Sequence, residues 1–69
     1  MKKFTIEIAS IPDMDNLVAE VWYDDQMVFE INQENGIQIQ FFKPFLEASY
    51  GFDDLLSTLN EAKAKLLGE

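Results

Sequence analysis

The acidic side chains are the residues of this sequence whose type and spacing could support chemistry. Two carboxylates in a cleft can divide general acid and base catalysis between them, and closely spaced carboxylates can bind calcium. Each acidic pair of this chain also has a simpler role as a turn former or helix cap, and we therefore expect no catalytic residue among them. The pairs are Asp13/Asp15, Asp24/Asp25 and Asp53/Asp54.

The segment Asp13-Met14-Asp15-Asn16 resembles the beginning of a calcium-binding loop. An EF-hand loop needs oxygen ligands at alternate positions, a central glycine and a terminal glutamate. Here Leu17 stands at the third ligand position, and no glycine follows it. The sequence therefore predicts no metal site.

Three residue types that carry much of enzyme chemistry are missing. The 69 residues include no cysteine, histidine or arginine. The chain therefore has no thiolate nucleophile, no imidazole base and no bidentate phosphate clamp. Its serines have no base to activate them, and its isolated glycines form no phosphate-binding loop. We expect a protein that is not an enzyme and holds no cofactor.

The charge is strongly negative, with 13 Asp and Glu against 5 Lys and a net charge of −8 at pH 7. Phosphate backbones would be repelled, so we expect no direct nucleic-acid binding. Lys2 and Lys3 could open a signal peptide, but Glu7 interrupts the apolar stretch that should follow. No run of about 18 apolar residues predicts a membrane span. We expect a cytoplasmic protein, and the lack of cysteine fits a reducing compartment.

The elements that must position these side chains are four strands and one helix. Alternating apolar and polar residues, or runs of β-branched and aromatic residues, predict the strands. Turn residues separate them, and residues 43–51 are expected to be irregular after Pro44. The predicted strands cover residues 4–8, 17–23, 27–33 and 37–42.

A C-terminal amphipathic helix is predicted from Asp53 to Leu67. Asp53 is expected to cap its beginning and Gly68 its end, and Glu61 and Lys65 form a favourable i, i+4 pair. The face expected to pack on the sheet carries Leu55, Leu59, Ala62 and Leu66, widened by Leu56 and Leu67.

These elements predict a single small α+β domain over residues 1–69. A four-stranded, mainly antiparallel sheet should carry the helix on one face, in the order β-β-β-β-α. The sequence does not fix the edge of the sheet that the first strand joins.

The strand register follows from placing apolar residues on one face. A three-residue loop, Glu34-Asn35-Gly36 with Gly36 left-handed, sets Ile31 opposite Ile39 and Phe29 opposite Phe41. A matching loop at Asp24-Asp25-Gln26 would pair Tyr23 with Met27.

The other face of the sheet is the candidate binding surface. Its predicted cross-strand rows are Val18-Asn32-Gln38, Glu20-Glu30-Gln40 and Trp22-Val28-Phe42. The third row would form an apolar strip of the kind that marks interfaces. In the second row Glu20 would face Glu30, and like charges directly opposite one another destabilise a strand pair. A positively charged partner would relieve that repulsion.

We therefore predict a partner-binding surface on this face, extended by the acidic turn. Its residues are Glu20, Trp22, Asp24, Asp25, Val28, Glu30, Gln40 and Phe42. Three simpler explanations stay open at this point. Residues 43–51 could fold back over the aromatic row, the glutamate pair could be solvated, and the acidity could serve solubility alone.

In its size, acidity and order of elements, the chain resembles small bacterial proteins of the toxin-immunity or inhibitor type. The resemblance spans residues 18–67, and the segments that carry it are Val18-Ala19-Glu20-Val21, Phe29-Glu30-Ile31-Asn32-Gln33-Glu34-Asn35-Gly36 and Phe52-Asp53-Asp54-Leu55-Leu56. It implies an antitoxin-like protein that neutralises a basic partner, such as a nuclease toxin or another nucleic-acid-binding enzyme, by occluding its functional surface. The same reasoning applies to phage-encoded inhibitors, and no residue roles carry over.

Two other classes of function remain open on the sequence. The first is a self-associating structural or accessory module, a homodimer formed through the Trp22-Val28-Phe42 strip or an exposed edge strand. The second is a small carboxylate enzyme or metal binder. It would show a raised carboxyl pKa or calcium-dependent stability.

Overall fold

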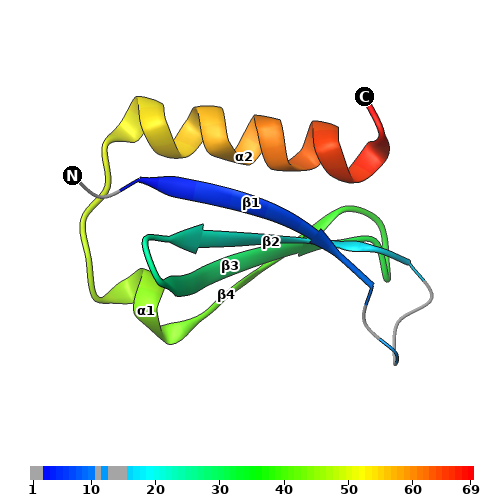
Figure 1. Ribbon diagram of the computed structural model, residues 1–69, viewed down its shortest axis with the longest axis horizontal. Helices are drawn as coiled ribbons and strands as arrows, with labels where there is room; N and C mark the ends of the chain where they lie inside the picture. Colours follow the sequence, from blue (N-terminus) through cyan, green and yellow to red (C-terminus); the bar gives the residue numbers. More distant parts are fainter. Residues whose placement is uncertain (1–2, 11, 13–15) are drawn as a thin grey trace.

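The computed structural model describes residues 3–10, 12 and 16–69 of the chain (Figure 1). Asp13 and Asp15, considered above for calcium binding, lie outside the described residues. The elements in chain order are β1 (Phe4–Ala9), β2 (Val18–Tyr23), β3 (Gln26–Asn32), β4 (Gln38–Phe41), α1 (Lys43–Leu46) and α2 (Phe52–Leu67).

The four strands form one antiparallel sheet in the order β1-β2-β3-β4. With α2 following the sheet, the predicted α+β order is confirmed. β1 joins the sheet beside β2, with Ile6 opposite Val21. This pairing answers the question that the sequence left open, and it makes β1 and β4 the two edge strands.

Helix α2 lies on one face of the sheet, which we call the inner face (Figure 1). It packs mainly over β2 and is flanked by β1 and β3. Ala62 and Leu66 are buried against the sheet, as predicted, and Thr58 is buried with them. Leu56 and Leu67 lie beside this stripe and remain partly exposed. The buried apolar cluster consists of Ala19, Val21, Val28, Phe29, Ile31, Ala62 and Leu66, and the partly buried residues packed around it are Phe4, Ile6, Tyr23, Phe45, Leu55 and Leu59.

The two ends of α2 differ in how well the sequence predicted them. Gly68 closes the helix in the left-handed conformation with φ 76°, as expected. Asp53 is not the N-cap, and that prediction is wrong: the helix begins one residue earlier, after Gly51, with no side-chain cap. Asp53 and Asp54 lie instead within the first turn, where the helix dipole still favours negative charge. The predicted Glu61–Lys65 ion pair is present at 3.8 Å.

The sequence predicts that residues 43–51 are irregular. The structure differs from this prediction in part, because Lys43–Leu46 form the short helix α1 with Pro44 in its first turn. The segment folds onto the inner face rather than over Trp22, Val28 and Phe42. The ring of Phe45 lies 4.6 Å from that of Phe41 and 5.9 Å from that of Phe29. These aromatic contacts explain why residues 43–51 pack on the inner face, since that face already holds the larger apolar surface.

The hairpin between β3 and β4 has the predicted register. Ile31 lies opposite Ile39 and Phe29 opposite Phe41. Gly36 has φ 79°, the left-handed conformation that the three-residue loop requires.

The hairpin between β2 and β3 differs from the prediction. Its turn contains only two residues, Asp24 and Asp25, because Tyr23 pairs with Gln26 and Trp22 with Met27. Asp24 has φ 57°, which suits a tight turn that matches strand twist. A bulge between Val21 and Trp22 then restores the expected Val21–Phe29 pair. Met27 is therefore opposite Trp22 and not on the inner face.

Candidate binding surface

The candidate surface is the side of the sheet opposite α2, which we call the outer face. Strand alternation places on it Glu7, Glu20, Trp22, Val28, Glu30, Gln40 and Phe42, and the bulge in the β2–β3 pair sets Met27 opposite Trp22. Neither described helix covers this face, because Phe45 of α1 and the buried side of α2 both pack on the inner face. Of its side chains, Glu7 and Gln40 are exposed, Glu20, Trp22, Met27 and Phe42 are half-buried, and Val28 and Glu30 are buried.

The main feature of the outer face is a row of three glutamates across three strands. Glu7 lies opposite Glu20, and Glu20 lies opposite Glu30. Gln40 of β4 continues the row beyond Glu30. We call Glu7, Glu20 and Glu30 the glutamate row. Sequence reasoning missed Glu7, because the alternation of Phe4–Ile8 predicts a strand but not its neighbour.

The glutamate row has no counter-ion within the described part of the chain. The ion pair found there joins Glu61 and Lys65 on α2, away from the outer face. Like charges opposite one another destabilise a strand pair. Nor do the glutamates form a cation site, since no group of three or more acidic side chains among the described residues could hold a metal ion. The arrangement is therefore suited to positive charge brought by another molecule.

Burial makes the outer face more unusual. The side chain of Glu30 is only 7% exposed, and its Oε2 atom is buried without a hydrogen-bond partner in the described structure. The indole Nε1 of Trp22 is also buried without one. A buried polar atom left unsatisfied costs about 1–3 kcal/mol, so such groups are uncommon in native proteins. Here an unpaired donor and an unpaired acceptor occur on the same face.

The other predicted site residues differ in how far their side chains are exposed. Gln40 and Asp25 are exposed, Phe42 and Glu20 are half-buried, and Val28 is 1% exposed. The predicted row of Trp22, Val28 and Phe42 is kept only in part: the Phe42 amide donates to the Val28 carbonyl at 3.0 Å, but Trp22 pairs with Met27. The bulge in the β2–β3 pair causes this shift.

Asp24 has a structural role that was not predicted. Its carboxylate Oδ1 accepts a hydrogen bond from the Lys3 amide at 3.1 Å, and its own amide donates to the Lys3 carbonyl at 3.0 Å. The turn is thereby tied to the beginning of β1. Of the acidic turn, Asp25 is the residue left free of these backbone contacts to Lys3.

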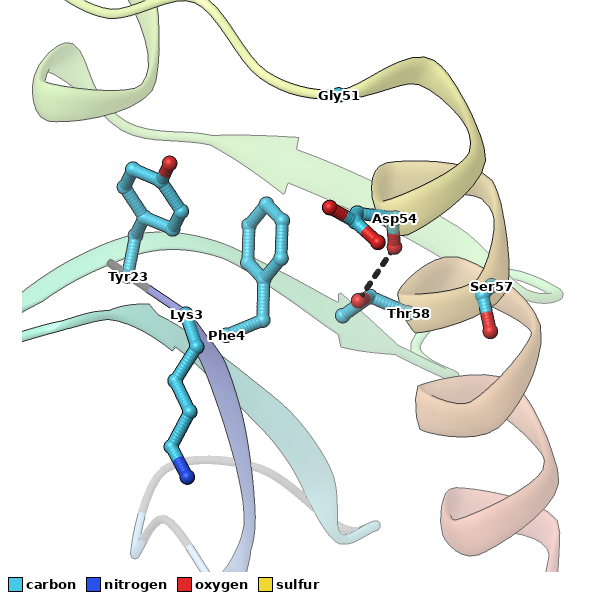
Figure 2. Close-up of a pocket in the computed structure, with 7 residues that line it drawn as sticks. All are labelled: Lys3, Phe4, Tyr23, Gly51, Asp54, Ser57 and Thr58. Carbon is cyan, nitrogen blue, oxygen red and sulfur yellow. Dashed lines mark hydrogen bonds between the residues drawn. The ribbon is translucent and has the colours of Figure 1, made fainter. Parts of the chain in front are cut away.

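A pocket of about 370 Å³ lies on the inner face, between the sheet and α2 (Figure 2). Its lining residues are Lys3, Phe4, Tyr23, Gly51, Asp54, Ser57 and Thr58. The Thr58 hydroxyl donates to the Asp54 carbonyl at 2.7 Å and so serves the helix itself. Figure 2 shows the Lys3 side chain pointing away from Asp54. The pocket offers one carboxylate and several hydroxyls, and it contains none of the predicted outer-face residues.

Comparisons with protein-family models, with curated proteins and with solved structures found no match to this chain. Within the described ranges, no helix is long and apolar enough to cross a bilayer. The function is therefore inferred from the residues of the outer face themselves.

Proposed function

We propose that this chain is an acidic protein-binding module that docks its outer face on a basic protein. By occluding the functional surface of that protein, it would inhibit or neutralise a nuclease toxin or another nucleic-acid-binding enzyme. The observation that carries the proposal is the glutamate row. Three glutamates lie at directly opposite positions on three adjacent strands, and none of them forms an ion pair with a described lysine.

A basic protein surface is the partner that this geometry favours. Surfaces that bind nucleic acid concentrate Lys and Arg, and their field attracts a chain of net charge −8 over a distance of several ångströms. Bringing a lysine or arginine against the glutamate row replaces repulsion between carboxylates by attraction. Electrostatic complementarity of this kind acts mainly on the rate of encounter and on specificity.

Trp22 is the proposed anchor of the contact. Tryptophan is enriched among the residues that dominate binding energy, because it buries a large area and carries one hydrogen-bond donor. Trp22 is half-buried beside Met27, and its buried Nε1 has no hydrogen-bond partner within the described part of the chain. Val28 and Glu30 are buried and contribute from beneath, through packing and through charge.

The proposal is tested by comparing two variants that remove the same amount of charge. Glu7→Gln/Glu20→Gln neutralises two members of the glutamate row, whereas Glu47→Gln/Glu61→Gln neutralises two exposed carboxylates away from it. Each variant is immobilised beside the unmodified chain and exposed to extract of the native host, and captured proteins are identified by mass. We expect a basic protein that the unmodified chain and the control retain and the outer-face variant loses. Equal capture by all three would contradict the proposal.

A further inference from the structure

Strand β4 is an edge of the sheet that carries no charge. Edge strands present unpaired backbone groups to other chains, and natural proteins commonly protect them with charged residues or proline. Gln38–Phe41 contain neither, and Asn35–Phe42 is the longest stretch of the sequence without a charged residue. The opposite edge, β1, carries Glu7. The β4 edge is therefore the less protected of the two.

The backbone of β4 is oriented for further pairing. The Phe42 amide donates to the Val28 carbonyl of β3 at 3.0 Å. In an antiparallel pair, successive residues point their N–H and C=O groups alternately toward and away from the neighbouring strand. The backbone groups of Ile39 and Phe41 therefore point away from β3, toward the free edge. Both side chains lie on the inner face and are 42% and 50% exposed, because α2 lies over β1, β2 and β3.

We propose that two copies of this chain pair antiparallel along β4 and form a homodimer with one continuous eight-stranded sheet. Ile39 of each copy lies opposite Phe41 of the other, so that their outward-pointing N–H and C=O groups make four hydrogen bonds. Gln40 then lies opposite its own counterpart on the outer face, where the two side-chain amides can bond to each other. This register uses the whole length of β4.

The charge distribution favours a second copy as the occupant of this edge. Two molecules that each carry −8 can approach only where the local charge is low, and β4 supplies such a place. A basic partner gains no electrostatic attraction from an uncharged strand. The strand is also self-complementary, because it places an aliphatic residue opposite an aromatic one twice, a combination that stabilises antiparallel pairs.

The dimer would unite the two outer faces on one side of the extended sheet. A two-fold axis between antiparallel edge strands runs perpendicular to the sheet, so both α2 helices stay on the same side. The pairing does not depend on the proposed binding of a basic protein, and each idea can fail without the other. Because one short strand buries less than the roughly 800 Å² that each partner gives to a standard interface, we expect association to depend on concentration.

The test is the molar mass of the unmodified chain and two variants, measured by sedimentation equilibrium over a wide concentration range. Ile39→Pro removes an N–H that points to the free edge and leaves the hydrogen bonds to β3 in place. Ile39→Thr is the control, because it loses the aliphatic side chain but keeps that N–H. We expect the mass of the unmodified chain to rise from 8.0 kDa to about twice that value. Ile39→Pro should stay monomeric, and Ile39→Thr should still associate.

Hydrogen exchange in the unmodified chain provides a second readout if Ile39→Pro does not fold. The amides of Ile39 and Phe41 should exchange more slowly as concentration rises, whereas the already bonded Gln40 amide should change less. A chain that stays monomeric at the highest concentration would overturn the proposal. So would an Ile39→Pro variant that associates as the unmodified chain does, or a dimer that leaves the Ile39 and Phe41 amides unprotected.

Discussion

Glu20 of β2 lies directly opposite Glu30 of β3, and no described lysine forms an ion pair with either. Glu7 of β1 extends the repulsion to a third strand. Each like-charge pair across a strand costs on the order of 0.2–1 kcal/mol. A small domain has a low free energy of unfolding, so a destabilising row of this kind is best explained by a function in binding a partner.

Neutralising part of the row should leave the free protein equally stable or more so. In Glu7→Gln/Glu20→Gln the strand pairs keep their geometry but lose like-charge repulsion, and we expect a gain of up to about 1 kcal/mol in the free energy of unfolding. Urea denaturation measures it. A clear loss of stability would show that the glutamates are satisfied within the fold, contrary to our account.

Truncating the anchor should affect dissociation rather than encounter. Trp22→Ala should raise the dissociation rate of a complex with the captured basic partner and cost about 2 kcal/mol or more of binding free energy. Phe52→Ala is a matched control, because it removes an exposed aromatic ring from α2. If the two variants bind alike, the anchor lies elsewhere.

The packing of α2 on the inner face can be tested with two neighbouring leucines. Leu66 is 6% exposed and Leu67 is 39% exposed. Leu66→Ala should cost about 2–5 kcal/mol, from lost burial and the cavity left behind, whereas Leu67→Ala should cost much less. Thermal denaturation of the two variants compares them directly. Equal losses would mean that the helix packs through a different stripe.

Gly36 should be required for its backbone conformation alone. With φ 79°, it lies in the left-handed region, and beyond its two chain neighbours no described atom lies within 4 Å of the position that a Cβ would take. Gly36→Val should therefore cost on the order of 1–2 kcal/mol through backbone strain, and Gly36→Asn should cost less, since asparagine tolerates this conformation. Equal stability of the two variants, measured in urea, would argue against the three-residue loop.

The phenol of Tyr50 should make the stability of the protein fall at alkaline pH. Burial, and to a lesser extent the nearby Tyr23, raise the pKa of Tyr50 above its ordinary value of 10.0. Its hydroxyl donates to the Phe45 carbonyl at 2.9 Å, a bond that requires the protonated phenol. Since the folded-state pKa is the higher one, the stabilisation is complete below pH 10 and is lost as pH rises through the folded-state pKa. Denaturation curves should show this alkaline loss, and Tyr50→Phe should lessen it.

Local signals made much of this fold predictable. The turn at Glu34-Asn35-Gly36, the alternation of β3 and β4, and the apolar stripe of α2 each depend on residues close in sequence. The place of β1 depends on a contact between distant segments, and nothing in Phe4–Ile8 specifies the neighbour. Glu7 was missed for that reason, although the other two members of the glutamate row were identified.

Two further differences have physical causes that alternation does not reveal. The bulge at Val21/Trp22 compensates for the two-residue turn, and a pattern of apolar positions gives the same Val21–Phe29 pair with or without it. Phe45 packs against Phe29 and Phe41, a contact on the inner face that alternation within the strands does not specify. The candidate surface was thus predicted in outline, whereas the burial of Val28 and Glu30 became evident only from the structure.

The most direct test of the central claim is the association rate constant with the captured basic partner as a function of salt. Screening shortens the reach of charge from about 30 Å at low ionic strength to about 8 Å at physiological strength. We predict that Glu7→Gln/Glu20→Gln associates more slowly than the Glu47→Gln/Glu61→Gln control at low salt, and that the difference shrinks as salt is added. Equal association rates for the two variants at low salt would contradict a role for the glutamate row in docking.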